Sequence, residues 1–400
     1  MNDEMSFWLI TPRDPIIVRD GRPFGPDPGA RAQSLPFPFP ATVAGAVRTR
    51  HGEQHGGFGT HGVTPAALRA LAVRGPFLVQ LAADGAPSLL LPAPGDALLL
   101  PDHADATAQR RWLRPLAVDA RAQSDFDGGL DYVGMPTPDN AKPLTGSPAF
   151  WWWSAYAAWL EAPGDDAVKL ADLGISRLTT ESRVHVRIDP LSGAADEGFL
   201  FQTSGLEFTR RPVAKPTWRL HETATLGVLV ATDADLAAGL GTLGGERRAV
   251  FWQPTTQDGI KACPPSVCDK IRENKACRLL LTTPGLFQAG LLPRFDWLAI
   301  PDLKLAIKGA VASRYDVISG WDYAADAAKA TRRLAPAGAV YYLSFAGSTA
   351  DAIDRFIERV WFQPVSDAAQ DRCDGFGVAV LGVWDGKQDR LEVKACLENQ

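Results

Sequence analysis

Apolar residues along the chain follow two spacings, the alternation typical of strands and the three-to-four-residue repeat typical of helices. Residues 5–20 read as a strand with kinks at Pro12 and Pro15, and "ATVAGAVRTR" after Pro40 has helical spacing. "TPAALRALAVRG" predicts a short helix, followed by the strands "PFLVQLAA" and "PSLLLPAP" around an Asp84-Gly85 hairpin turn. The chain therefore opens as strand, helix and antiparallel hairpin.

From about residue 95 to 215 the pattern becomes irregular, rich in Pro, Gly and Asp, with one predicted helix, "SPAFWWWSAYAAWLEA". "TATLGVLVAT", "DADLAAGLGTL" and "ERRAVFWQP" then predict strand, helix and strand, with Asp233 or Asp235 as the helix N-cap. Residues 1–262 thus contain a β-α-β-β…β-α-β order. That order is compatible with a ferredoxin-like α+β sheet that carries a large insertion.

A second α+β set follows the candidate junction "CPPSVCDKIRENKAC". The segments "CRLLLTTPGLF", "GAVYYLSF" and "GFGVAVLGVW" are strand-like, and "TADAIDRFIERV" is helical. The fold class expected is α+β, with two related domains at 1–262 and 270–400 and the insertion at about 95–215.

Composition narrows the class of protein. Of the 400 residues, 46% are hydrophobic and 22% charged, and the net charge of -5 argues against a uniformly basic nucleic-acid coat. We find no apolar run near the ~20 residues that cross a bilayer and no signal-peptide pattern at the N-terminus. Five cysteines suit a reducing compartment. These features predict a cytoplasmic protein without a membrane partner.

The segment "ESRVHVRID" carries the clearest charge pattern. In a strand, Arg183, His185 and Arg187 share one face at a spacing of about 6–7 Å, near the phosphate step of an extended single strand. Together with "DPLSGAADEGFLFQTSGLEF", the segment predicts a long hairpin that reaches away from the body. A solvated edge hairpin, in which Glu181 and Asp189 neutralise the arginines, is the competing interpretation.

A glycine turn, "RDGRPFG", places Arg19 and Arg22 on either side of Asp20-Gly21. Glycine permits close backbone approach to a ligand, and arginine forms forked bonds to phosphate. The helix that follows puts Thr42, Gly45 and Arg48 on one face, and its N-terminal end favours an anion. An internal Arg–Asp pair on a surface turn is the alternative.

Two more basic segments follow the same logic. "TLGGERR" places Gly244, Gly245 and Arg247 at the entry to a strand. "AAKATRRLAPAGAVYYL" carries basic residues into a turn: Lys329, Arg332, Arg333 and Gly338. Each is also compatible with an ordinary solvated charge cluster.

Signatures of enzymes and metal sites are missing from the sequence. "CDGFGVAVLGVW" contains Gly375 and Gly377 but is not a dinucleotide fingerprint, and we find no phosphate-binding loop, HExxH or GxSxG motif. Three cysteines between 263 and 277 lack the spacing of a known zinc ribbon. We therefore expect no cofactor, no metal and no catalytic residue.

The predicted helix carries three consecutive tryptophans, Trp151, Trp152 and Trp153, which span about 200° of its circumference. One of them is expected to face a partner protein, unless the helix is wedged between two layers of this protein.

Taken together, "TPRDPIIVRDGRPFG" with "PFPFPATVAGAVRTR" resembles the N-terminal signature of the third subunit of the type III-B (Cmr) CRISPR effector complex, in the RAMP superfamily. The likeness continues through "ESRVHVRIDPLSGAADEGFLF", "LGGERR", "APAGAVYYL" and "GFGVAVLGVW", in the same order over nearly the full chain. No single motif is decisive, but the set is specific.

The resemblance implies two RNA-recognition-type ferredoxin-like domains and a protruding hairpin at 181–208. It also implies a non-catalytic RNA-binding subunit of an antiviral ribonucleoprotein, which grips the 5′ repeat-derived handle of the CRISPR RNA. Expected partners are the large polymerase/cyclase subunit and the first repeated backbone subunit, with target RNA contacted indirectly through the guide–target duplex.

Carried onto this chain, the resemblance assigns RNA contacts to Arg19, Gly21, Arg22, Thr42, Gly45, Arg48 and the hairpin, and the superfamily's glycine-rich loop to Gly375, Phe376 and Gly377. Phe24 and Tyr341 are candidates for stacking on bases. Two other functions remain open. A RAMP-type endoribonuclease would use His185 or His221 for acid–base cleavage, and a purely protein-binding scaffold would show no salt-dependent RNA affinity.

Overall fold

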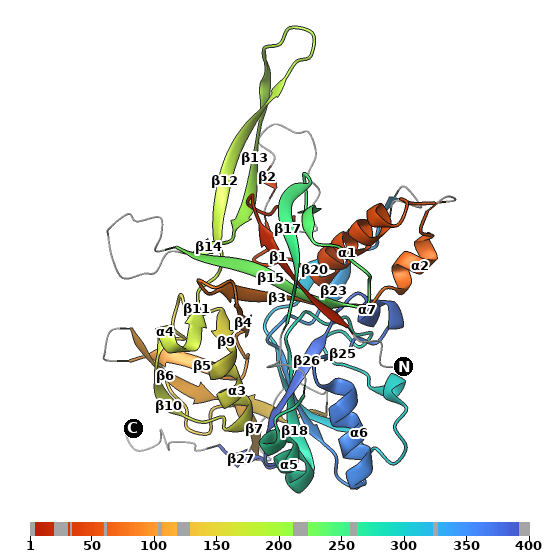
Figure 1. Ribbon diagram of the computed structural model, residues 1–400. Helices are drawn as coiled ribbons and strands as arrows, with labels where there is room; N and C mark the ends of the chain where they lie inside the picture. Colours follow the sequence, from red (N-terminus) through yellow and green to blue (C-terminus); the bar gives the residue numbers. More distant parts are fainter. Residues whose placement is uncertain are drawn as a thin grey trace.

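The computed structural model describes residues 5–19, 31–32, 34–59, 62–102, 106–117, 129–210, 223–256, 262–322 and 327–391. Within them the protein is an α+β structure built on two antiparallel sheets, with a long hairpin that projects from one end (Figure 1). The predicted α+β class is confirmed.

The larger sheet belongs to the N-terminal half and its insertion. Its path is β11-β9-β4-β3-β15-β1-β17-β16, with β14 on the side of β15. These strands are β1 (Ser6–Pro12), β3 (Val73–Leu81), β4 (Pro87–Pro92), β9 (Phe150–Trp152), β11 (Gly174–Ile175), β14 (Thr209–Arg210), β15 (Ala224–Thr232), β16 (Gly239–Leu243) and β17 (Arg248–Thr255).

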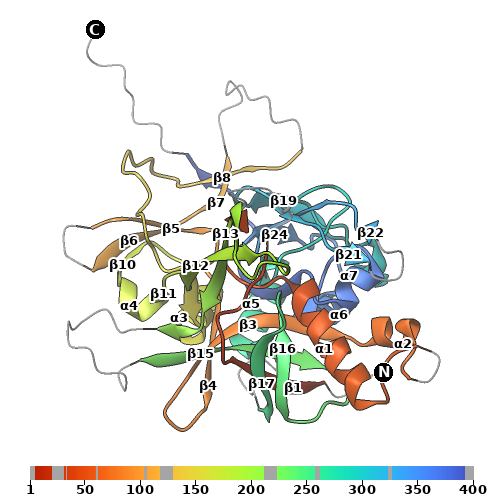
Figure 2. The same cartoon turned by 90° about the horizontal axis from the view of Figure 1, so that it is seen from above.

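Two helices accompany this sheet in the first hundred residues. Helix α1 (Pro40–Gln54) begins at the predicted proline and contacts β3 and β16, as Figure 2 shows. Helix α2 (Pro65–Ala70) is capped by Thr64, whose hydroxyl accepts from the Ala67 amide. The hairpin turn at Asp84-Gly85 is also confirmed, with Gly85 at φ 84°.

The smaller sheet belongs to the C-terminal half, and its five strands have the order β19-β24-β18-β26-β25. It consists of β18 (Ala276–Leu281), β19 (Ala306–Val311), β24 (Val340–Ser344), β25 (Gln363–Pro364) and β26 (Val378–Val383). Its helices are α5 (Pro265–Asn274), α6 (Ala350–Val360), α7 (Ala369–Cys373) and the 3-10 turn η2 (Asp296–Leu298). Helix α5 occupies the predicted junction, where "CPPSVCDKIRENKAC" begins and ends at a cysteine.

The remaining elements form small sheets around the two large ones. They are β5 (Ala97–Pro101), β6 (Thr107–Trp112) and β10 (Asp166–Lys169); β7 (Arg114–Ala117), β8 (Tyr132–Gly134) and β27 (Asp389–Arg390); β2 (Arg31–Ala32), β12 (Thr179–Ile188) and β13 (Ala195–Glu207); β20 (Asp316–Ile318) with β23 (Arg332–Leu334); and β21 (Trp321–Asp322) with β22 (Ala327–Ala328). The insertion also holds α3 (Trp153–Glu161) and α4 (Leu170–Leu173).

The main hydrophobic core continues across the two halves. It joins Leu9 and Phe77 of the first sheet to the strands of the second, and Phe77 meets Phe362 edge to face. The insertion enters the same core through Trp159. The domain boundary between 262 and 270 stays a prediction, because the apolar packing crosses it.

Two predicted elements are wrong. The segment "DADLAAGLGTL" is not a helix: it ends as strand β16, and Asp233 accepts the Ala72 amide at 2.8 Å instead of capping a helix. The tryptophan segment is a helix only from Trp153 onward, since Trp151 and Trp152 lie in β9 beside β4. Trp151 is buried, and Trp153 packs on Trp361 and Phe362, so these tryptophans contact the protein's own layers.

Candidate nucleic-acid interface

Two predicted motifs and the base of the hairpin meet beside the end of β1. The Ile16 amide donates to the Leu206 carbonyl in β13 at 2.9 Å, and the Gly245 amide donates to the Ile17 carbonyl at 2.7 Å. Arg19 follows directly and is exposed, with its backbone bridged to Ser34. Segments more than 180 residues apart in the sequence therefore lie together at this point. Gly21, Arg22 and Phe24 lie outside the described residues.

The "TLGGERR" turn is fitted closely to this segment. Gly244 has φ 75°, and a Cβ on it would lie 2.5 Å from the Ile17 carbonyl oxygen, so glycine is required by the turn itself. Arg248 pairs with Glu246 at 2.6 Å. Arg247, at φ 51°, is exposed and forms no hydrogen bond or ion pair within the described chain. Arg247 is thus available to a ligand.

The predicted hairpin is confirmed as β12 and β13, which extend from the body of the protein (Figure 1). Its pairing is regular from Thr179 to Val186, as the alternation requires, and shifts register between Val186 and Ile188. The second face is solvated, since Val184 is 70% exposed. On the first face Arg183 bonds Glu181 at 2.6 Å, and this bond lowers the pKa of the Glu181 carboxyl. His185 stacks on Phe201 with ring centroids 5.1 Å apart. The hairpin thus places Arg183 and His185 on one face, and Glu181 neutralises Arg183 as the competing interpretation expected.

His185 is held in place within the hairpin. Its Nε2 lies 2.8 Å from the Thr203 hydroxyl oxygen, and Phe201 covers one face of its ring. Arg187 lies at a register shift between Val186 and Ile188, so strand alternation does not place it on the face of His185. His221, the other histidine considered for acid–base cleavage, lies outside the described residues.

The three residues predicted to share one face of α1 differ in their exposure to solvent. Gly45 is exposed, and a Cβ there would meet nothing within 4 Å, so the surface above it is open; Thr42 is half-buried one turn earlier. Arg48 turns inward instead: its Nη2 lies 2.7 Å from the Asp374 carboxylate and bonds the Arg69 and Leu71 carbonyls. Arg48 therefore joins the N-terminal half to α7.

The basic segment of the C-terminal half forms strand β23. Lys329 and Arg333 are exposed, and the Arg333 guanidinium lies 4.6 Å from the centre of the Tyr315 ring. Arg332 bonds Asp371 at 2.9 Å, and although this bond acts in the opposite direction, burial raises the pKa of the Asp371 carboxyl.

This segment is close to α1 through a small apolar cluster. Phe39, the residue before α1, packs with Leu334 and Phe376. Leu35 touches the same cluster, and its amide donates to the Val18 carbonyl beside Arg19 at 2.7 Å. Residues 34–39 thus run from the Arg19 segment to the Arg333 strand, and the two basic regions lie at the ends of one short stretch of chain.

Four predicted contact residues are buried by the fold. A Cβ on Gly338 would lie 2.5 Å from the Ala93 carbonyl oxygen, one on Gly375 2.8 Å from that of Val73, and one on Gly377 2.9 Å from the Ser366 hydroxyl. The structure thus accounts for these glycines by internal packing. The stacking role expected of Tyr341 is wrong, because its ring is fully buried and its hydroxyl donates to the Leu291 carbonyl at 2.6 Å.

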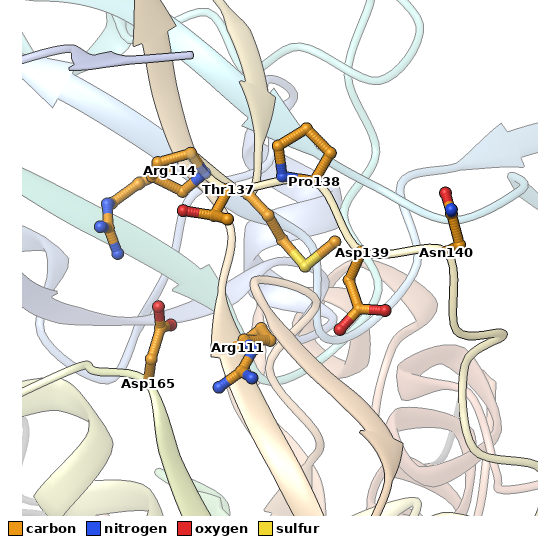
Figure 3. A pocket seen from close by; sticks show the side chains of 9 residues that line it. Arg111, Arg114, Thr137, Pro138, Asp139, Asn140 and Asp165 are labelled. Atoms are coloured by element: carbon orange, nitrogen blue, oxygen red, sulfur yellow. The ribbon is translucent and has the colours of Figure 1, made fainter. Parts of the chain in front are cut away.

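Sequence reasoning missed a polar pocket of about 620 Å³ in the insertion. Figure 3 shows Arg111 and Arg114 on one side, with Asp165 and Asp139 nearby. Arg114 pairs with Asp389, and Asp165 accepts the Trp112 amide at 2.7 Å. Two arginines and two aspartates line the pocket, so charges of both signs face it and it does not select an anion. The sequence signal for it was the group of arginines in β6 and β7, Arg110, Arg111 and Arg114.

Among the described residues, no group of three or more His, Cys, Asp or Glu side chains is placed to hold a metal ion. Burial raises the pKa of the Cys263 and Cys277 thiols, which disfavours the thiolate form that zinc binds. No helix in the described part of the chain is long and apolar enough to cross a membrane.

Comparison of the sequence with models of protein families gives one match that covers nearly the whole chain. The model of the CRISPR-associated protein family Cas_Cmr3 matches residues 8–384. The chain belongs to the Cas_Cmr3 family. The resemblance drawn from the sequence motifs is thereby confirmed. No curated protein matches the chain.

Solved structures similar to this Cas_Cmr3 chain come from type III-B assemblies. One is described as "Cryo-EM structure of the Type III-B Cmr-beta bound to cognate target RNA", with 16% identity, 84% of this chain and 86% of that chain covered, and a TM-score of 0.44. Another, with AMPPnP also bound, has 14% identity, 88% of each chain covered and a TM-score of 0.42. Likeness at this level carries no residue assignment, so the interface rests on this chain's own geometry.

Proposed function

We propose that this Cas_Cmr3 chain is a non-catalytic RNA-binding subunit of a cytoplasmic type III-B CRISPR ribonucleoprotein. It grips the 5′ repeat-derived handle of the CRISPR RNA and docks the large polymerase/cyclase subunit to the first repeated backbone subunit. The hairpin β12–β13 lies along the guide–target duplex and so meets the target RNA indirectly.

The observation that carries the proposal is the junction at Ile16 and Ile17. Their backbone bonds to Leu206 and Gly245 hold Arg19, the base of the hairpin and Arg247 in one region. Residues 34–39 connect this region to Arg333, and exposed Gly45 leaves room for a strand to approach α1. Exposed arginines beside open backbone suit a single-stranded RNA, whose phosphates and splayed bases are both accessible.

We further propose that each half is a ferredoxin-like unit with one helix replaced. In the first sheet the strands β17-β1-β15-β3 have the order fourth, first, third, second of a β-α-β-β-α-β unit. In the second sheet β26-β18-β24-β19 have the same order. Such units use the sheet and adjoining loops as a platform for RNA.

The experiment is filter binding of labelled CRISPR RNA with a native or a scrambled 5′ handle, over a salt series, with the same samples on a denaturing gel. It is run on the full chain and on the complex assembled with its partner subunits. Arg247→Ala and Arg333→Ala are each expected to weaken binding and to lower the slope of log affinity against log salt by about 1. Arg19→Ala and Arg22→Ala together are expected to weaken the native handle most.

Arg355→Ala is the matched control, because Arg355 is exposed on α6 and pairs with Asp351 on the same helix. Unchanged handle affinity in all three arginine variants, with the control also unchanged, contradicts the grip. Cleaved RNA on the gel, lost in His185→Ala, establishes the endoribonuclease instead. Absence of salt-dependent binding in both chain and complex establishes the scaffold.

A further inference from the structure

A second basic pocket lies on the seam between the two halves, at a place that no sequence motif indicated. Its volume is about 280 Å³, and it is lined by the start of β3, the end of α6, β25, η2 and α7. Three arginines contribute to its wall, Arg74 from the N-terminal half and Arg359 and Arg372 from the C-terminal half. None of the lining residues is a carboxylate. We call this site the seam pocket.

Two of its donor groups have no partner among the residues that the structure describes. Arg74 is half-buried and forms no hydrogen bond or ion pair within the described chain. Burial lowers the pKa of the Arg74 guanidinium although the Asp233 charge acts in the opposite direction, so its desolvation is not offset. The buried Trp297 Nε1 is likewise without an acceptor. A buried donor without a partner is costly, and such donors mark sites that an acceptor from outside can complete.

The other two arginines are held in position by backbone carbonyls. Nη1 of Arg372 donates to the Ser366 and Asp367 carbonyls at 2.8 and 2.6 Å, and its guanidinium lies 4.1 Å from the centre of the Trp297 ring. Arg359 donates through Nη1 to the Leu298 carbonyl. Each guanidinium has five N–H donors, so both retain donors for a ligand while their positions are fixed in advance.

We propose that the seam pocket binds a phosphate group carried by a larger ligand. Three cations around one small cavity repel each other, and a phosphate removes that repulsion while accepting bonds from several guanidiniums at once. The free Trp297 N–H adds a neutral donor of the kind a phosphate oxygen accepts. The volume exceeds that of a bare phosphate, so a sugar fits beside it. Because none of the lining residues belongs to the proposed handle interface, the proposal does not rest on that function.

The phosphate has two possible sources, a small phosphorylated molecule or a phosphodiester of bound RNA. Isothermal titration calorimetry of the full chain with inorganic phosphate and with ribose 5-phosphate measures the first. Competition of ribose 5-phosphate with labelled single-stranded RNA in filter binding measures the second.

Arg74→Met is the main variant, since it keeps the length of the side chain and breaks no hydrogen bond of the free protein. We expect at least a tenfold loss of affinity, about the contribution of one charged hydrogen bond. The melting temperature of the free variant should be equal or higher, because an uncompensated cation is removed. Trp297→Phe removes only the N–H donor and should weaken binding several-fold. Arg355→Met, one turn before Arg359 on the same helix but not among the residues that line the pocket, should change nothing.

Ribose 5-phosphate binding that Arg74→Met abolishes, without competition from RNA, supports a small phosphorylated ligand. RNA binding that Arg74→Met weakens, with or without competition by ribose 5-phosphate, supports a strand phosphate. If no phosphate compound binds and Arg74→Met leaves RNA affinity unchanged, the proposal is overturned. It is also overturned if Arg74→Met and Trp297→Phe bind ribose 5-phosphate as the unaltered chain does. Neither result argues against the proposed handle interface, because that interface is tested by separate variants at Arg19, Arg247 and Arg333.

Discussion

The N-terminal and C-terminal halves arrange four central strands in the same order, but the helix follows the first of these strands in one half and precedes the last of them in the other. In the first half α1 follows the first strand, and the connection between β15 and β17 holds strand β16 and no helix among the described residues. In the second half α6 precedes β26, and the connection from β18 to β19 holds only the 3-10 turn η2 in its described residues, all of 282–305. The same strand order thus forms without a helix after the first strand or without a helix before the fourth strand.

An arginine from the retained helix stabilises the irregular connection in both halves. Arg50 of α1 donates to the Ala237 carbonyl at 3.0 Å and to the Leu240 carbonyl at 2.9 Å. Arg359 of α6 donates to the Leu298 carbonyl. A connection without a helix leaves backbone carbonyls unpaired, and the guanidiniums supply the missing donors.

The two halves differ in how their sheets are fixed to the insertion. In the C-terminal half Arg278 of β18 is fully buried, bonds Asp96 of the insertion at 2.6 Å, and donates to the Trp159 carbonyl at 2.5 Å. Trp159 Nε1 donates to the same Asp96 carboxylate at 3.0 Å. The N-terminal half instead extends its own sheet into the insertion, where β4 pairs with β9. A buried polar network thus joins the five-stranded sheet to the insertion, whereas the larger sheet continues into the insertion by strand pairing; outside the five-stranded sheet, β27 also pairs with β7.

The largest effect is expected from breaking that network. Asp96→Ala leaves the Arg278 charge buried without its partner, which costs about 3–5 kcal/mol of the free energy of unfolding. Urea unfolding, followed by tryptophan fluorescence, measures the loss. Asp389→Ala, which removes the partly exposed partner of Arg114, should cost less than about 1 kcal/mol. Equal losses in the two variants contradict a special role for the buried network.

A smaller effect is expected from removing the arginine of one connection. Arg50→Met takes donors from the Ala237 and Leu240 carbonyls in a nearly buried setting, and should cost about 1–3 kcal/mol. Arg359→Met removes one bond from a more exposed side chain and should cost about 0.5–1.5 kcal/mol. The same unfolding measurement ranks them. A larger loss in Arg359→Met reverses the comparison between the halves.

The smallest effect concerns the exposed hairpin tip, where Leu191 is 96% exposed. Bonds from the Ser192 hydroxyl and the Leu191 and Ser192 amides hold the pKa of Asp189 below its usual range. A lowered folded-state pKa stabilises the tip above the unfolded pKa near 4, and this is lost as pH falls through the folded value. Amide exchange at Leu191 and Ser192 should therefore speed up, relative to other exposed amides, only in strong acid. In Asp189→Asn this acid-dependent step should disappear, and its persistence would assign the step to another group.

Local sequence determined the elements whose signals lie within a few residues. Pro40 starts α1, Asp84-Gly85 turns the first hairpin, and the alternation from Glu181 to Val186 sets the two faces of β12. Each depends on a backbone constraint or a period that needs no distant partner. The order of such motifs along the chain was also enough to indicate the family.

Tertiary structure decided what local signals left ambiguous. Residues 239–243 pair with β17 because the Gly244 turn folds them back onto an open sheet edge, and this overrides the apolar spacing that suggested a helix. Gly338 and Gly375 resemble ligand-binding glycines in sequence, yet the backbone of Ala93 and Val73, more than 240 residues earlier in the chain, fills the space beside them. The seam pocket gathers Arg74, Arg359 and Arg372 from positions almost 300 residues apart. A spacing pattern records only neighbours along the chain, whereas burial and charge proximity depend on which surfaces the fold brings together.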